Sequence, residues 1–255
     1  MQRPRKLLME TRQIILDKTP GSPESTKNTK RIENMTSELA KYFDRLNDTF
    51  PYDEMPQKKE GMNDSDITDD IMNLLIPALV TLQPMLNNII QTNAYRSYID
   101  TSRDFIKTFN TGKSLPIENA IEYASNRSAQ MIKNIDETTR KRIQELVKQN
   151  LKQNKSIDDL AKAIQSEFNE MSRSRAYKIA RTETADALGD ASMRQAKDEN
   201  LEEKTIILGS NPCVICLDNE AEGWMDINDG YSSGDDRAPF HPNCVCTNIY
   251  RRKPI

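Results

Sequence analysis

The sequence has little histidine, cysteine, glycine and aromatic character. It holds one histidine, four cysteines and eight glycines, and aromatic residues make up 6% of its 255 positions. So few glycines argue against a large all-β fold. With 36% hydrophobic and 29% charged residues, the composition favours helices around a modest core, in one or two domains. We expect part of the chain to rest against partners.

Two kinds of targeting segment are missing from the pattern. The start, MQRPRKLLMETR, lacks the apolar region of a secretory signal, so no export is predicted. Residues 71–95 carry no charge, but they include Pro77, Pro84 and several Asn and Gln residues. A membrane-spanning helix needs about 20 predominantly apolar residues. We therefore predict a buried, Pro-kinked helix here and no membrane contact.

Two features of phosphate-binding proteins are also missing. The GKS at 112–114 lacks the glycine that a phosphate-binding loop needs five positions earlier, where Lys107 stands. Residues 198–240 contain 2 Lys/Arg against 11 Asp/Glu, whereas 130–180 contain 11 against 7. Since a DNA-reading module must neutralise phosphates, the acidic segment argues against one, and only the basic helical region could touch DNA.

Apolar residues at helical spacing predict most of the chain to be α-helix. Ser156 with Asp159 predicts a capping box at the start of one of these helices. Proline, glycine and polar residues predict a linker or mobile loop at 19–30 and a loop at 51–65. We expect helices over 3–19, 30–49, 66–110 (broken at its prolines), 117–152, 157–168 and 173–200, the last with Ala176, Tyr177, Ala180, Ala187, Leu188 and Ala191 facing inward.

All the soft metal ligands fall in one short stretch. They read CVIC at 213–216 and HPNCVC at 241–246. Zn²⁺ in structural sites takes four N or S ligands in a tetrahedron, and clustered cysteines without an export signal favour metal over disulfides. We predict a structural Zn²⁺ bound by Cys213, Cys216, His241 and Cys244, because 241 and 244 repeat the spacing of the first pair. Cys246 is the alternative fourth ligand.

Short β-type runs flank this stretch. KTIILGS precedes the first pair and TNIYRR follows the second, and Trp224 is expected to pack under the metal site. The predicted fold class is therefore mainly α (α+β), a helical body with a small C-terminal zinc-bound β unit. The predicted regions are 1–65, flexible or extended helical; 66–114, helical and a candidate for partner binding; 115–200, helical; and 201–255, the zinc-bound β unit.

Several of these strings together resemble one family. RAYKIARTETADALGDASMRQA at 175–196, followed by CVIC and HPNCVC, is similar to phage head morphogenesis proteins of the Mu F type, and the helical segment 126–164 adds to the likeness. The resemblance covers about 115–250, so that 115–200 becomes the helical part of a Mu F-like domain. Val245 stands where the family more often has arginine, and residues 1–110 match no family pattern.

The resemblance implies a minor virion protein that acts in head assembly. It implies association with the portal vertex or packaged DNA, with the portal protein, the major capsid protein or a scaffolding protein as partners. The implied location is the virion, in the head interior or at the portal vertex, and the host cytoplasm during assembly.

Two other functions compete with this one, a metal-dependent hydrolase and a nucleic-acid-binding module. A hydrolase needs an open metal position and a general base, and the one histidine is already used in the cluster. We therefore expect no enzyme activity. Asp226, Asp229, Asp235 and Asp236 are interpreted as a solvated acidic loop, and Arg181, Thr182 and Glu183 as polar contacts that orient the zinc unit on the helices.

Overall fold

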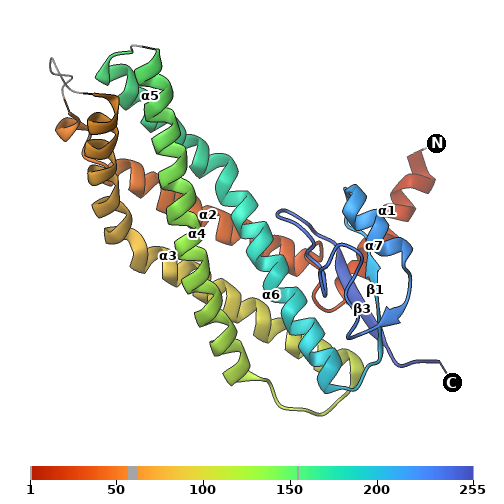
Figure 1. Cartoon of the computed structure of the whole chain (residues 1–255). Coiled ribbons are helices and arrows are strands. Elements are labelled where there is room, and N and C mark those ends of the chain that lie inside the picture. Colours follow the sequence, from red (N-terminus) through yellow and green to blue (C-terminus); the bar gives the residue numbers. More distant parts are fainter. Residues whose placement is uncertain (1, 57–62, 154, 255) are drawn as a thin grey trace. The chain divides into compact units, whose positions relative to one another are not determined.

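The computed structural model describes residues 2–56, 63–153 and 155–254, which form long helices followed by a small sheet (Figure 1). This confirms the predicted mainly α fold with a small C-terminal β unit. The elements are α1 (Gln2–Lys18), α2 (Thr26–Thr49), the 3₁₀ turn Tyr52–Glu54, α3 (Asp64–Phe109), α4 (Ile117–Lys152), α5 (Ile157–Glu170), the π-helical turn Met171–Arg175, α6 (Ala176–Asp198), β1 (Glu203–Ile207), α7 (Val214–Ala221), β2 (Met225–Asp226) and β3 (Thr247–Arg251).

The chain divides into two compact units, each assembled from separated segments. One comprises Met1–Thr36, Thr92–Ala124 and Tyr177–Ile255, and the other comprises Ser37–Gln91 and Ser125–Ala176. Helices α2, α3 and α4 contribute residues to both. The four consecutive regions read from the sequence stay a prediction, while the units that contacts define interleave along the chain.

The unit built from 37–91 and 125–176 has an apolar helical core. The apolar stripes predicted for these segments are buried, and Ser156 forms the predicted capping box with Asp159 at the start of α5. Arg175 lies in this core, where its guanidinium is 5.4 Å from the ring centroid of Phe43 and donates to the Thr139 hydroxyl at 2.8 Å. The fully buried side chains of this unit include Leu39, Phe43, Leu46, Ile71, Leu75, Leu79, Leu86, Ile143, Val147, Ile164 and Phe168.

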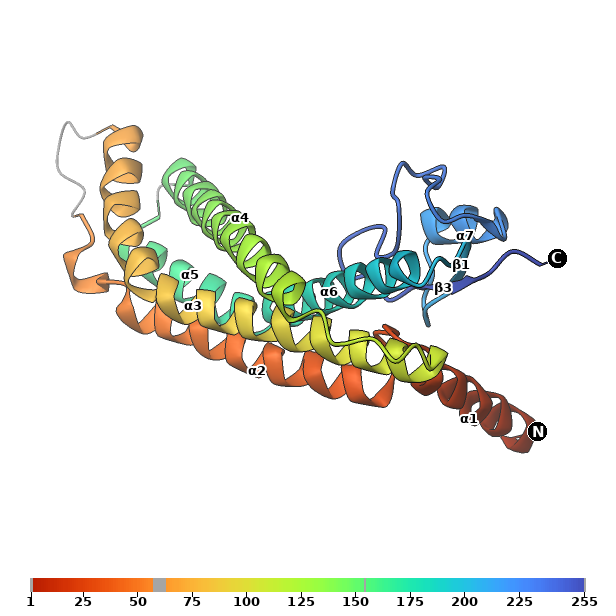
Figure 2. The same ribbon diagram turned by 90° about the horizontal axis from the view of Figure 1, so that it is seen from below.

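The helix predicted to be broken at its prolines is one continuous element, α3. Both Pro77 and Pro84 are exposed, so the backbone around them can adjust toward solvent. Figure 2 shows that the N-terminal part of α3 runs in a different direction from the rest of it, as the prolines predicted. Among the described helices, α3 is the one long and apolar enough to cross a membrane by length and composition.

The linker or mobile loop predicted at 19–30 is instead a short buried loop followed by the first turn of a helix. Helix α2 begins at Thr26, and Gly21, Ser22 and Pro23 are buried. The Gly21 carbonyl accepts a hydrogen bond from the Thr247 hydroxyl at 3.3 Å, so this loop contacts the C-terminal sheet. Gly21 has φ +79°, and a Cβ there would lie 2.1 Å from the Ser192 hydroxyl, so the loop needs glycine at this point.

The C-terminal sheet has the order β2-β1-β3, with both pairs antiparallel. Glu203 pairs with Asp226 of β2 and with Arg251 of β3, which fixes the register at one end. The predicted strands at 204–210 and 247–252 correspond to β1 and β3, and they lie side by side in Figures 1 and 2. The sequence reading missed the two-residue strand β2 and the short helix α7.

Candidate metal centre

The first cysteine pair is positioned by the start of α7. Cys213 is the N-cap of this helix, with φ −87° and ψ 176°, and Cys216 lies in its first turn. A spacing of three residues brings two side chains onto the same side at a helix start. The two sulfur atoms are 3.7 Å apart, and Cys216 is 1% exposed.

The second pair comes from the turn that precedes β3. His241 Nε2 lies 3.2 Å from the sulfur of Cys213 and 3.3 Å from that of Cys216. The sulfur of Cys244 lies 3.7 Å from that of Cys216. The predicted ligands therefore form two groups that share Cys216: Cys213, Cys216 and His241, and Cys216, Cys244 and Cys246, with the donor atoms of each group within 4.8 Å of one another.

The two sulfur–sulfur distances from Cys216, to Cys213 and to Cys244, suit the edges of a tetrahedral metal site. With Zn–S bonds of about 2.3 Å, the edge between two sulfur ligands of a tetrahedron is about 3.8 Å. The two measured sulfur–sulfur separations are both 3.7 Å. Soft sulfur and imidazole donors at this spacing are the donor set that Zn²⁺ takes in structural sites, so the residues present fit a metal ion of this kind.

Cys244 and Cys246 differ in the form that their surroundings favour. A hydrogen bond from the Cys246 thiol lowers the pKa of Cys244 to about 5, in spite of burial. The same bond, with burial, raises the pKa of Cys246, which keeps its proton. The sulfur of Cys246 also accepts a hydrogen bond from the Gly209 amide at 3.3 Å. Thiolates are the metal ligands, and these surroundings favour the thiolate of Cys244 and the thiol of Cys246.

Backbone hydrogen bonds and burial also shift the pKa values of the remaining donors. A hydrogen bond from the Cys216 amide lowers the pKa of Cys213, whereas burial raises the pKa of Cys216 to about 12. Burial acts to lower the pKa of His241, but its hydrogen bond to a backbone carbonyl and the nearby cysteines raise it overall. A bound cation would favour the thiolate forms.

One face of α6 holds the second cysteine turn. The Thr182 hydroxyl accepts a hydrogen bond from the Asn243 amide at 2.8 Å, and Asn243 has φ 67°, in the left-handed region. This contact joins the IARTET string to the HPNC string. The interpretation of Thr182 as a residue that orients the cysteine unit on the helices is therefore supported by a specific hydrogen bond.

Further along α6, two carboxylates of the helix bind Arg237, which lies in the loop before the second cysteine pair. Its guanidinium lies 3.0 Å from Asp186 and 3.6 Å from Asp190. Gly189 lies between them, and a Cβ there would stand 2.4 Å from the Ala238 carbonyl oxygen. The sequence thus places a glycine where the backbone of the loop lies close to the helix.

Lys204 organises the acidic loop from within. Its side chain is fully buried, and its ammonium donates to the backbone carbonyls of Ile227, Asp229 and Asp236. The same ammonium lies 5.0 Å from the ring centroid of Tyr231. Burial lowers the pKa of Lys204. A single lysine in an acidic segment was the signal that could have identified this residue from the sequence.

Two predicted placements are wrong. Trp224 does not pack under the metal cluster: it is 36% exposed, and the Arg251 guanidinium lies 3.9 Å from its ring centroid. Tyr177 does not face inward: it is exposed, and its hydroxyl accepts a hydrogen bond from Arg181 at 3.3 Å. In both cases the aromatic ring packs against an arginine at the surface, a contact that residue spacing alone does not reveal.

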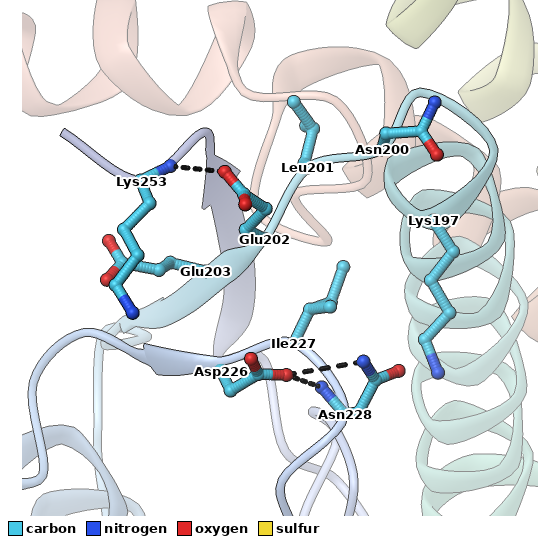
Figure 3. Close-up of a pocket in the computed structure, with 9 residues that line it drawn as sticks. All are labelled: Lys197, Asn200, Leu201, Glu202, Glu203, Asp226, Ile227, Asn228 and Lys253. Atoms are coloured by element: carbon cyan, nitrogen blue, oxygen red, sulfur yellow. Dashed lines mark hydrogen bonds between the residues drawn. The ribbon is translucent and has the colours of Figure 1, made fainter. Parts of the chain in front are cut away.

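A cavity of about 380 Å³ lies beside the sheet and contains none of the cluster residues (Figure 3). Its carboxylates are already engaged: Glu202 accepts from the Lys253 amide at 3.0 Å, Asp226 from the Asn228 amide at 2.9 Å, and Glu203 pairs with Arg251 at 2.7 Å. The cavity is lined by Lys197, Asn200, Leu201, Glu202, Glu203, Asp226, Ile227, Asn228 and Lys253.

Comparison with known proteins identifies a family that part of the chain matches. Residues 141–249 match the family described as Phage Mu protein F like protein. The matched segment runs from the second half of α4 into β3 and includes the whole Cys/His cluster. No curated protein matches the chain, and no solved structure matches it.

Proposed function

We propose that this chain is a minor virion protein that acts in head assembly and associates with the portal vertex, because residues 141–249 match the family described as Phage Mu protein F like protein. The family match carries this proposal. Its partners are then the portal protein, with the major capsid or a scaffolding protein, and the chain passes from the host cytoplasm into the virion.

The Cys/His cluster has a structural role in this proposal, holding one Zn²⁺ through Cys213, Cys216, His241 and Cys244. The proposal is supported by the short distances that join Cys213 to Cys216 and His241, by the distance from Cys216 to Cys244, and by the lowered pKa of Cys244. The ion would join the start of α7 to the turn before β3. Metal binding to small units of this kind can contribute on the order of 10 kcal/mol to folding.

The chain is proposed to have no enzyme activity. A catalytic zinc keeps one position open for water or substrate, and four side chains would close the shell. The described metal-binding groups contain only cysteine and histidine, with no carboxylate among the donors. A metal-dependent hydrolase remains the alternative, and a nuclease or peptidase assay of the zinc-loaded protein would reveal it.

Packaged DNA is a secondary contact at most in this proposal. The segment 198–240 has 11 acidic and 2 basic residues and would repel phosphates. A weak, strongly salt-dependent interaction of the basic segment 130–180 is the form that such a contact would take. Measuring DNA binding at several salt concentrations separates this from a nucleic-acid-binding function, which would show tighter binding that depends on the cysteine unit.

The proposal is tested by assembly. The chain would be produced together with the portal, scaffolding and major capsid proteins of the same phage, and the purified particles would be analysed for its presence. We expect a few copies per particle and co-purification with isolated portal rings. Particles and portal rings that both lack the chain would contradict the proposed function.

A further inference from the structure

Helix α7 exposes three large aliphatic side chains on the surface of the cysteine unit. Val214 is 70% exposed, and Ile215 and Leu217 are each 45% exposed. They flank Cys216, which is buried. Isolated exposed apolar residues are ordinary, but a contiguous group on a folded surface indicates an interaction site.

Helix geometry places the three residues together and away from the metal cluster. Each residue advances about 100° around an α-helix. With Val214 as the reference, Ile215 lies about 100° to one side and Leu217 about 60° to the other. Cys216 then points in the opposite direction from the middle of this arc. The aliphatic face is therefore turned outward by the same geometry that turns the cysteine inward.

Neither the metal cluster nor the core requires aliphatic residues at these positions. A C-x-x-C pair constrains only its two cysteines. The core of the cysteine unit is formed by other buried residues, among them Ile206, Tyr231 and Phe240, with Leu208, Cys213 and Met225 packed against it. Polar residues would suit the outer face of α7 equally well if it only faced solvent.

The charge of the segment that carries this face selects the kind of partner. From Thr205 to Asp236 the chain contains no Lys or Arg and seven Asp or Glu residues. Asp218 and Glu220 are exposed on α7 itself. A second copy of this face or an anionic membrane would bring like charges together, which is unfavourable. A protein surface with an aliphatic groove and Lys or Arg at its rim would complement both the shape and the charge.

We propose that the outward face of α7, formed by Val214, Ile215 and Leu217, docks into such a basic-rimmed apolar groove on the portal ring. This inference rests on the proposed function and names the surface through which it acts. The metal cluster would fix α7 rigidly, so that the aliphatic side chains are presented without loss of backbone freedom on binding. Acidic residues beside them would speed the encounter at low salt.

The test compares two triple variants for binding to purified portal rings. The first is Val214→Ser/Ile215→Ser/Leu217→Ser. The matched control is Met9→Ser/Ile14→Ser/Ile15→Ser, which removes three exposed apolar side chains from α1 instead. Zinc content and thermal stability are measured for both, because the serine residues on α7 must leave the unit folded. Asp218→Lys, with one exposed charge reversed, keeps the aliphatic face and tests the charge alone.

We expect the α7 variant to bind portal rings about tenfold or more weakly than the wild type, because central apolar contacts dominate interfaces. The α1 control should bind as the wild type does. Asp218→Lys should slow association, and the difference from wild type should shrink at high salt.

Portal binding that is unchanged in the folded α7 variant would overturn the docking surface and leave the proposed function standing. Wild-type protein that does not bind portal rings at all would overturn both. Self-association of the wild type that the α7 variant abolishes would show that a second copy occupies the face, and would also overturn the proposed partner.

Discussion

Replacing Gly189 with alanine should destabilise the protein, although the same change in an ordinary helix interior stabilises it. Gly189 lies inside α6, where alanine is favoured over glycine by about 1 kcal/mol. Here the added methyl group would stand 2.4 Å from the Ala238 carbonyl oxygen and 2.9 Å from an Arg237 guanidinium nitrogen. The arginine can turn aside, but the carbonyl belongs to the backbone and must move with its loop.

The expected size of the effect follows from these opposing contributions. Forcing an extra methyl group into a close contact costs about 1–3 kcal/mol. Moving the loop outward also lengthens the 3.0 Å contact between Arg237 and Asp186. Against the helix preference for alanine, we expect a net loss of about 1–2 kcal/mol, which corresponds to a melting temperature lower by about 2–8 °C for a chain of this size.

The assay is thermal unfolding of Gly189→Ala beside wild type, with Asn134→Ala as the control. Asn134 lies on the exposed side of α4, so alanine there should leave the melting temperature unchanged or raise it slightly. A Gly189→Ala protein that melts at or above the wild-type temperature would refute the close approach of α6 to the loop at 238.

Three further outcomes are expected. Leu79→Asp should unfold the protein, because Leu79 is fully buried and an unpaired carboxylate there costs several kcal/mol, whereas Val80→Asp at the neighbouring position, 53% exposed, should be tolerated in a melting experiment. Lys204→Met should lower stability by about 3 kcal/mol or more, since it leaves three carbonyls without their donor, and urea unfolding followed by tryptophan fluorescence would measure it. Burial raises the pKa of Asp136 in the folded protein. The protonated carboxyl therefore favours folding at pH values below its unfolded pKa, and this stability is lost as the pH rises through the folded pKa. Asp136→Asn should raise the melting temperature at neutral pH, and the gain should disappear in acid.

Periodic apolar stripes predicted the helices well because each stripe is one buried face. Ile32, Met35, Leu39, Phe43 and Leu46 follow helical spacing and are all buried in α2. Apolar spacing did not predict helix α7, because its apolar residues face outward and it has only eight residues. The strand β2 has two residues, too few for any alternation to show.

The cluster could be predicted from the spacing of its residues, but the contacts that attach it to the rest of the protein could not. The five donor residues are brought together as the sequence indicated. Its attachment to α6 through Thr182 and Asn243 depends on a contact between residues 61 positions apart. The buried loop at Gly21 likewise reads as a solvated linker, because its glycine, proline and serine residues carry no sign of their distant partners in α6 and β3.

Zinc content of the purified protein and of two cysteine variants tests the central claim most directly. Native mass spectrometry would count the metal ions per chain for wild type, Cys244→Ser and Cys246→Ser. We predict about one zinc in wild type, loss of the ion in Cys244→Ser and retention in Cys246→Ser. A metal-free wild-type chain with its cysteines joined as disulfides would contradict the metal centre, and loss of zinc in Cys246→Ser with retention in Cys244→Ser would contradict the ligand set.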